Sequence, residues 1–344
     1  MRKHFYKKYI GWTLSIAAGC AFLSMANLDT FAKEPSPIPE PIIAQKNDAA
    51  PQIPAGTRIW KNTPYITNGH ERNILDLLVP PSDKPLPLIV WVHGGAWVGG
   101  DKGEGALLLR YLQQGYAIAA INYRFSQHAI FPAQLEDCKA AIRWLRSNAD
   151  ATGIDPKRIG VGGGSAGGHL VALLGSTGQE KKYDVGEYTD VSSEVQAVCD
   201  FFGPADFEHF EFDAVSNNPG RDDPKNPFWL LVGGHPNTLK NDAEALKKLN
   251  ENLRDVSPVT HVMKNHPPTV ILHGNKDDIV PLSQSELYLK ALKEKEVESA
   301  LYVVDGCGHG FLGENIWRIM DTFFERHLKP EKASIGYREQ LSHP

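Results

Sequence analysis

A serine stands among glycines in the stretch RIGVGGGSAGGHL, and two kinds of chemistry fit it. Gly163, Ser165 and Gly167 match G-x-S-x-G, the tight strand-to-helix turn that presents a nucleophilic serine. Gly162, Gly164 and Gly167 match G-x-G-x-x-G, the turn that holds the pyrophosphate of a dinucleotide. The residues elsewhere in the chain must therefore distinguish a nucleophile from a nucleotide site.

The dinucleotide interpretation lacks the partners that it requires. Such a loop follows the first strand of a βαβ unit and has an acidic residue at the end of the next strand. Here the loop follows two predicted strand–helix units, and the next segment, GQEKKYDVGEYTD, is polar and has no strand pattern. The histidines form no H-x-x-x-H or H-x-H pair beside a carboxylate. We therefore predict no cofactor and no metal site.

The nucleophile interpretation finds its partners further along the chain. A serine hydroxyl needs a histidine to accept its proton, and that histidine needs a carboxylate to orient it. After the predicted strand 269–273 comes HGNKDDIVP with Asp277, and after the last predicted strand comes DGCGHGF with His309. Both loops leave the carboxyl ends of strands, where open α/β sheets place their sites. The sequence thus predicts a catalytic triad of Ser165, Asp277 and His309.

Donors for a tetrahedral oxyanion are predicted from a second loop. The apolar strand 86–92 runs into HGGAW, whose small residues let backbone N–H groups approach a substrate. We expect Gly94 and Gly95 to donate there, together with Ala166 directly after the serine. His93 is expected to hold this loop by hydrogen bonding.

Other residues compete for the same roles. Asp278 is next to Asp277, although the spacing to Val280-Pro281 favours Asp277. Asp206 follows another strand end, from which some hydrolases take their acid. We expect His169 and His273 to be packed histidines with satisfied hydrogen bonds, and Arg124 and Asp137 to form a structural pair.

The motifs HGGAW, GGSAGG, D-x-x-V-P and GHGF, in this order, resemble those of the α/β-hydrolases. They are most similar to the hormone-sensitive-lipase-like and bacterial feruloyl or acetyl-xylan esterase group. The resemblance covers about residues 57–328 and implies an α/β-hydrolase fold, with a mostly parallel central sheet flanked by helices. It also implies the triad and oxyanion donors given above. Ala96 departs from the third glycine of many relatives, and a positive φ is less easy for alanine.

The pattern of the chain agrees with this fold class. Apolar runs alternate with helical patterns from residue 57 onward. The predicted strands are 58–66, 73–79, 86–92, 116–123, 158–162, 195–202, 269–273 and 300–305, and the first two are expected to be antiparallel. The predicted helices are 107–114, 134–148, 166–174, 283–292 and 315–328.

One long segment, 206–255, interrupts the alternation and is rich in Asn, Asp, Pro and aromatic residues. Long insertions in compact domains are usually functional, so we expect a lid-like insertion. Trp97, Phe202 and Phe207 are expected to contribute to the substrate pocket.

The two ends of the chain lie outside the predicted catalytic domain, 57–330. Residues 1–32 combine a basic start with an apolar run and small residues, which is typical of a secretory signal peptide. A membrane anchor and lipidation at Cys20 are alternatives. Residues 33–56 read as a Pro-rich flexible linker and 331–344 as a C-terminal tail. We expect an exported protein, periplasmic or extracellular, with no stable membrane span after signal cleavage.

Composition limits the partners. The formal net charge of the 344 residues is −5, and the basic residues are scattered, so no nucleic-acid partner is expected. Without the signal, Cys138, Cys199 and Cys307 remain at no metal-like spacing. All three are expected to be small buried residues.

The predicted activity is hydrolysis of carboxylic esters on a small-molecule or polysaccharide substrate, such as acetyl or feruloyl esters of plant polysaccharide. A kynurenine-formamidase-like amidohydrolase is an alternative, since H-G-G-x-W also resembles that group. A non-catalytic carbohydrate-binding relative is another.

Overall fold

A nine-stranded β-sheet forms the centre of the computed structural model, which describes residues 38–45, 53–217 and 220–329. In spatial order the strands are β1 (Ile42–Ile43), β2 (Arg58–Pro64), β3 (Ile74–Val79), β5 (Ala117–Ile121), β4 (Leu86–Val92), β6 (Ile154–Gly164), β7 (Ala197–Phe201), β8 (Thr269–Gly274) and β9 (Ser299–Val304). The pairs from β1 to β5 are antiparallel, and all pairs from β5 to β9 are parallel. The predicted mostly parallel sheet with an antiparallel opening is confirmed.

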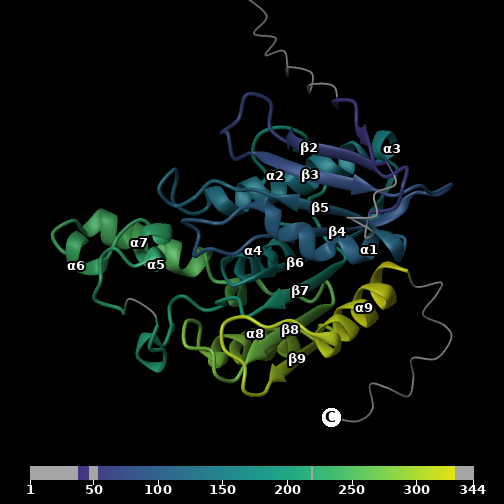
Figure 1. Cartoon of the computed structure of the whole chain (residues 1–344). Coiled ribbons are helices and arrows are strands. Elements are labelled where there is room, and N and C mark those ends of the chain that lie inside the picture. Colours follow the sequence, from purple (N-terminus) through teal and green to yellow (C-terminus); the bar gives the residue numbers. More distant parts are fainter. Residues whose placement is uncertain (1–37, 46–52, 218–219, 330–344) are drawn as a thin grey trace, which may run out of the picture. The chain divides into compact units, whose positions relative to one another are not determined.

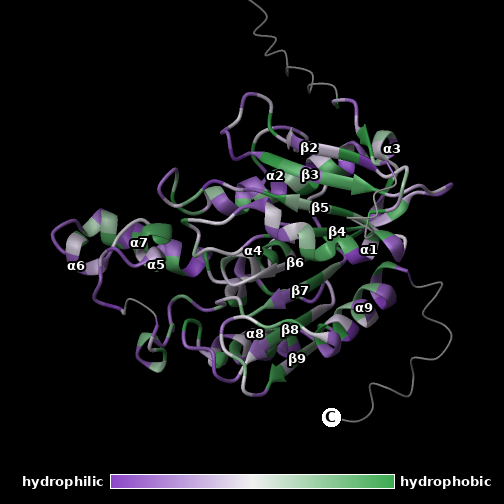
Figure 2. Ribbon diagram, viewed as in Figure 1, coloured by the Kyte–Doolittle hydropathy of each residue, from purple (hydrophilic) through white to green (hydrophobic). Residues whose placement is uncertain are grey.

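Both faces of the sheet are buried, which explains the apolar runs in the sequence. In β4, Leu88 and Val90 point into one core cluster, whereas Ile89 and Trp91 point into another. Successive residues of a strand face opposite sides, so a strand covered on both sides must be apolar throughout. The central strands accordingly carry the hydrophobic colour in Figure 2.

Helices cover the two faces (Figure 1). Residues of α2 (Ala133–Ser147), α4 (Ala166–Ser176) and α8 (Leu282–Glu294) pack on one face. The 3-10 helix η1 (Lys102–Leu109), α1 (Arg110–Gln113) and α9 (Glu314–Leu328) pack on the other. Shorter elements complete this core: α3 (Ala149–Thr152), η2 (Lys181–Tyr183) and η4 (Pro258–His261).

Some elements differ from the prediction. The helix expected at 107–114 is a 3-10 helix from Lys102 followed by one α-helical turn, because Asp101 caps it by accepting from the Gly103 N–H at 2.8 Å. The strand expected at 158–162 belongs to the longer β6. Strand β1 was not predicted; it lies in the predicted linker and pairs Ile42 with Ile59. The predicted signal peptide and C-terminal tail fall outside the described residues.

The predicted insertion contains four helical elements, η3 (Phe212–Ala214), α5 (Pro227–Val232), α6 (Pro236–Leu239) and α7 (Ala243–Asp255). Its aromatic side chains are buried and belong to the main core cluster: Phe207, Phe210, Phe212, Phe228 and Trp229. Phe207 and Phe228 stack with ring centroids 4.8 Å apart. The segment is therefore packed onto the domain by its own aromatic residues, and movement as a lid stays a prediction.

Cys138, Cys199 and Cys307 are free thiols. Cys138 and Cys199 are buried, as predicted, whereas Cys307 is only half-buried because its loop lies near the surface. Within the residues that the structure describes, no helix has both the length and the apolar character needed to cross a bilayer.

Candidate active site

Ser165 occupies a sharp turn between β6 and α4. Its backbone has φ 56° and ψ −121°, a conformation that is strained for a residue with a side chain. The turn needs glycine on both sides: a Cβ on Gly167 would lie 2.1 Å from the Val92 carbonyl oxygen, and one on Gly163 would lie 2.5 Å from the Gly167 oxygen. The glycines of the motif thus provide space for the turn.

Asp277 and His309 meet at the carboxyl ends of β8 and β9. The Nδ1 atom of His309 lies 2.7 Å from Oδ2 of Asp277. The other carboxylate oxygen accepts the N–H groups of Ile279 and Val280, each at 2.9 Å. Burial raises the pKa of Asp277, but hydrogen bonds from His273 and then His309 outweigh it, so this pKa lies well below its ordinary value. Asp277 is therefore a fixed carboxylate anion.

A second histidine contacts the same carboxylate. The Nε2 atom of His273 lies 3.3 Å from Oδ2 of Asp277 and 3.0 Å from the Val280 oxygen, while Nδ1 lies 2.7 Å from the hydroxyl of Ser285. His273 is fully buried, as expected of a packed histidine. The sequence did not reveal its contact with Asp277.

The alternative acids have other partners. Asp278 accepts from the side-chain amide of Asn217 at 2.7 Å. Asp206 accepts from the backbone N–H groups of Glu208 and His209 and pairs with the His209 ring. Of the three candidates, Asp277 is the one that is hydrogen-bonded to His309.

The HGGAW loop follows β4 with three successive positive φ angles, 101° at Gly95, 51° at Ala96 and 58° at Trp97. Ala96 thus adopts a positive φ, a conformation that residues with a Cβ atom disfavour. The Gly94 N–H points to a carboxylate and donates to Oε2 of Glu104 at 3.1 Å. Within the described residues, the N–H groups of Gly95, Ala96 and Ala166 have no recorded acceptor. Gly94, expected as an oxyanion donor, is therefore engaged by Glu104, which leaves Gly95, Ala96 and Ala166 as the candidate donors.

A polar network of His93, Arg72 and Tyr123, which was not predicted from the sequence, holds this loop in place. His93 lies with Nδ1 2.7 Å from the Gly94 oxygen and Nε2 3.0 Å from Nη2 of Arg72. Burial lowers the pKa of His93 to about 4, so its ring is neutral, and this pattern places the proton on Nδ1. Arg72 also donates to the Tyr123 oxygen at 2.8 Å and lies 3.6 Å above the Phe125 ring.

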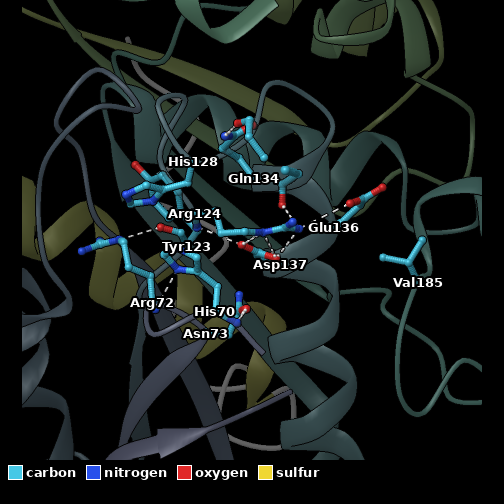
Figure 3. A network of polar contacts seen from close by, with 12 residues as sticks. His70, Arg72, Asn73, Tyr123, Arg124, His128, Gln134, Glu136, Asp137 and Val185 are labelled. Atoms are coloured by element: carbon cyan, nitrogen blue, oxygen red, sulfur yellow. Dashed lines mark hydrogen bonds and ion pairs between the residues drawn. The ribbon is translucent and has the colours of Figure 1, made fainter. Parts of the chain in front are cut away.

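The expected pair of Arg124 and Asp137 continues this network (Figure 3). Nε and Nη2 of Arg124 both donate to Asp137, at 2.9 Å to Oδ2 and 2.8 Å to Oδ1. The Arg124 N–H donates to the same carboxylate. This bidentate contact ties the segment after β5 to α2 and confirms the predicted structural pair.

Ser165 and His309 line one cavity of about 470 Å³. Its wall is mostly apolar and consists of Trp91, Gly94, Gly95, Ala96, Glu104, Leu107, Gly164, Ser165, Phe201, Phe202, Ile279, His309, Gly310, Phe311 and Leu312. The expected pocket residue Phe202 lies here. Phe311 and Leu312 were not predicted to line the pocket, although both directly follow the GHG of the histidine loop.

Trp97 and Phe207 do not line this cavity. Both are buried in the main core cluster, and their ring centroids lie 5.7 Å apart. The Trp97 indole N–H donates to Nδ1 of His169 at 3.1 Å, and His169 Nε2 contacts the Val256 oxygen. The positive φ of Trp97 turns its side chain into the core, which corrects the pocket prediction. His169 is the packed histidine that was expected, and burial lowers its pKa to about 4.

A mostly parallel sheet with a serine turn after one strand, and an acid and a histidine after later strands, defines an α/β-hydrolase. The BD-FAE family model matches residues 75–292, and the chain belongs to this family. A solved truncated carbohydrate esterase from gut microbiota is 32% identical, with a TM-score of 0.69 over 79% of this chain and 96% of that one. An acetyl ester-xyloside bifunctional hydrolase from Caldicellulosiruptor lactoaceticus is 26% identical, with a TM-score of 0.55 over 76% and 86%.

Curated relatives carry esterase names. Esterase LipC of Mycobacterium tuberculosis is 32% identical over 243 residues, which cover 66% of this chain and 54% of LipC. The probable carboxylic ester hydrolase LipM of the same organism is 30% identical, over 63% of this chain and 47% of LipM. The chain thus spans about half the length of these two relatives. The predicted resemblance to the esterase group is confirmed.

Proposed function

We propose that the protein is a serine hydrolase of carboxylic esters, with Ser165 as nucleophile, His309 as base and Asp277 as the orienting acid. One observation carries this proposal: Ser165, on its strained turn, opens into the same cavity as His309, whose Nδ1 is held by Asp277. This contact leaves Nε2 of His309 as the nitrogen for proton transfer. The esterase names of the relatives support the same reaction class.

The reaction follows from these groups. His309 accepts the hydroxyl proton as Ser165 Oγ attacks the ester carbonyl carbon, and the carbonyl oxygen becomes an oxyanion. The N–H groups of Gly95, Ala96 and Ala166 stabilise that charge. The C–O bond to the alcohol then breaks, His309 gives its proton to the departing alkoxide, and an acyl-serine remains. Water repeats the sequence and releases the carboxylic acid.

The proposed substrates are acetyl or feruloyl esters of plant polysaccharide or its fragments, outside the cytoplasm. Two observations support this choice. The basic and apolar start of the chain is typical of an export signal. Similar solved structures are named a carbohydrate esterase and an acetyl ester-xyloside hydrolase. The test is a panel of p-nitrophenyl esters beside acetylated xylan and methyl ferulate.

Replacement of the nucleophile tests the reaction itself. We expect Ser165→Ala to lower kcat for ester hydrolysis by roughly four orders of magnitude or more, because the acyl-enzyme cannot form. A fluorophosphonate probe should label the native chain and leave this variant unlabelled. Ser82→Ala, in a turn outside the cavity, is the matched control and should retain labelling and activity. Near-native turnover by Ser165→Ala would contradict the assignment.

A further inference from the structure

A carboxylate forms part of the cavity wall beside the HGGAW loop, residues 93–97, which we call the oxyanion loop. Glu104 lies in the first turn of η1, and its side chain borders the space that Ser165 and His309 line. Its Oε2 accepts the Gly94 N–H at 3.1 Å, so the carboxylate is fixed next to the loop whose following N–H groups are free. This hydrogen bond holds the Glu104 carboxylate next to the loop where the carbonyl group of an ester would bind.

Nothing else in the cavity offsets this charge. The other lining residues are apolar or small, apart from Ser165 and His309. In the part of the chain that the structure describes, no ion pair to Glu104 is recorded. Lys102, two residues earlier, is buried and directs its ammonium group to Asp76 at 2.9 Å. The cavity therefore carries an uncompensated negative charge close to the reacting serine.

A substrate with a charge of its own responds to this carboxylate. A carboxylate or phosphate beside the ester bond would bind near Glu104, and the two anions would repel each other. Because Glu104 is exposed, water and salt screen part of this repulsion. Neutral groups meet no such repulsion, and hydroxyl or ammonium groups find an acceptor. The oxyanion of the intermediate is matched by its own N–H donors, whereas a second anion would have none.

We propose that Glu104 determines the charge specificity of this enzyme: it selects esters whose flanking groups are neutral or cationic and rejects those that carry an anion beside the scissile bond. This inference rests on the proposed ester hydrolysis. It adds a selection rule for the substrate that the triad and the oxyanion donors do not provide, because they act on every ester in the same way.

Two ethyl esters of nearly equal shape test the rule. Ethyl levulinate carries a neutral methyl ketone where monoethyl succinate carries a carboxylate. Their kcat/KM values are measured by titration of released acid at neutral pH and low salt. We expect the native enzyme to prefer the levulinate, Glu104→Gln to reduce this preference on the order of tenfold, and Glu104→Lys to reduce it further. Added salt should narrow the preference of the native enzyme more than that of Glu104→Gln.

The variants and the control separate charge from structure. Glutamine keeps an oxygen that can accept the Gly94 N–H, and Glu104 is exposed, so the turn should persist. Glu294→Gln removes an equal charge from the far end of α8 and should leave the preference as it is. An unchanged preference in both Glu104 variants, with ethyl levulinate still hydrolysed, would overturn the charge rule and leave the ester hydrolase intact. A native chain that neither hydrolyses ethyl levulinate nor reacts with the fluorophosphonate probe would overturn the proposed function, and this rule with it.

Discussion

At the scale of single residues, Asp277, the proposed acid, is held by other groups besides His309, the base that it orients. Asp277 has a partner for each carboxylate oxygen: two backbone N–H groups on Oδ1, and His309 with His273 on Oδ2. His273 donates through Nε2, because this nitrogen faces two groups that can only accept, the Val280 oxygen and Asp277 Oδ2, while its Nδ1 can accept the hydroxyl proton of Ser285. An imidazole N–H in this position fixes the carboxylate and shares its charge.

Removal of this donor should change the pH dependence of the reaction. In His273→Leu, Oδ2 of Asp277 keeps one partner, and its negative charge acts more strongly on the His309 ring. We expect kcat to fall and the acidic limb of the kcat/KM profile to move to higher pH. His273→Gln places an amide N–H near the position of Nε2 and should restore part of both. A lower unfolding temperature with an unchanged pH profile would mean that His273 only fills space.

The residues of the proposed triad could be predicted from the sequence because each one lies in the turn or loop that follows a strand, and the strands are clear from their apolar runs. The oxyanion donors could not be predicted in full. Their directions depend on the backbone angles of Gly95, Ala96 and Trp97, which are positive in a row and turn Trp97 into the core. No residue pattern specifies such angles, and Glu104 comes from a helix whose register also had to be known.

At the scale of elements, the oxyanion loop depends on an arginine from the segment between β2 and β3. Arg72 contacts His93 on the loop, donates to the oxygens of Tyr123 and Gly100, and covers the Phe125 ring. These contacts connect three segments that are distant in the sequence. Because the N–H groups of Gly95 and Ala96 are not held by hydrogen bonds of their own among the described residues, contacts with neighbouring segments must fix the loop conformation.

Loss of this arginine should therefore affect catalysis more than binding. We expect Arg72→Met, which keeps much of the side-chain length but no donor, to lower kcat about tenfold or more with a smaller change in KM, because oxyanion donors act in the transition state. Arg318→Met, at an exposed position of α9, is the control. A raised KM with native kcat would contradict a role in holding the donors.

At the level of elements, the helices inside the insertion 206–255 were not predicted individually. Helix α7 had a readable signal: Asp242 caps it by accepting the Ala245 N–H at 2.9 Å, and Leu246, Leu249 and Leu253 lie on one stripe. Helices α5 and α6 are shorter than two turns, too short for a period to appear. Their position depends on the aromatic cluster, whose contacts are distant in sequence.

At the scale of the whole molecule, burial keeps several histidines neutral. It lowers the pKa values of His93, His169 and His266 to about 4, against an ordinary value near 6.5. Between about pH 6.5 and pH 4, the unfolded chain therefore binds more protons than the folded chain. The free energy of unfolding decreases as the pH falls through this range. Asp200 acts in the opposite direction, since burial raises its pKa to about 6 and its protonation favours the folded state below that pH.

The histidines with lowered pKa values, which also include His128 and His327, set the sign of the net effect, because they outnumber the groups with raised pKa values, Asp200, Glu136 and His209. We expect the thermal unfolding midpoint to fall by several degrees between pH 7.5 and pH 5, as followed by calorimetry. His266 offers the sharpest variant, because it lies outside the cavity and contacts the Tyr288 hydroxyl at 3.0 Å and the Pro267 oxygen at 2.7 Å. His266→Gln removes one of these titrations, so its midpoint should fall less over the same pH range, even if it starts lower. An equal or higher midpoint at pH 5 in the native chain would mean that the carboxylates, and not the buried histidines, govern its stability in acid.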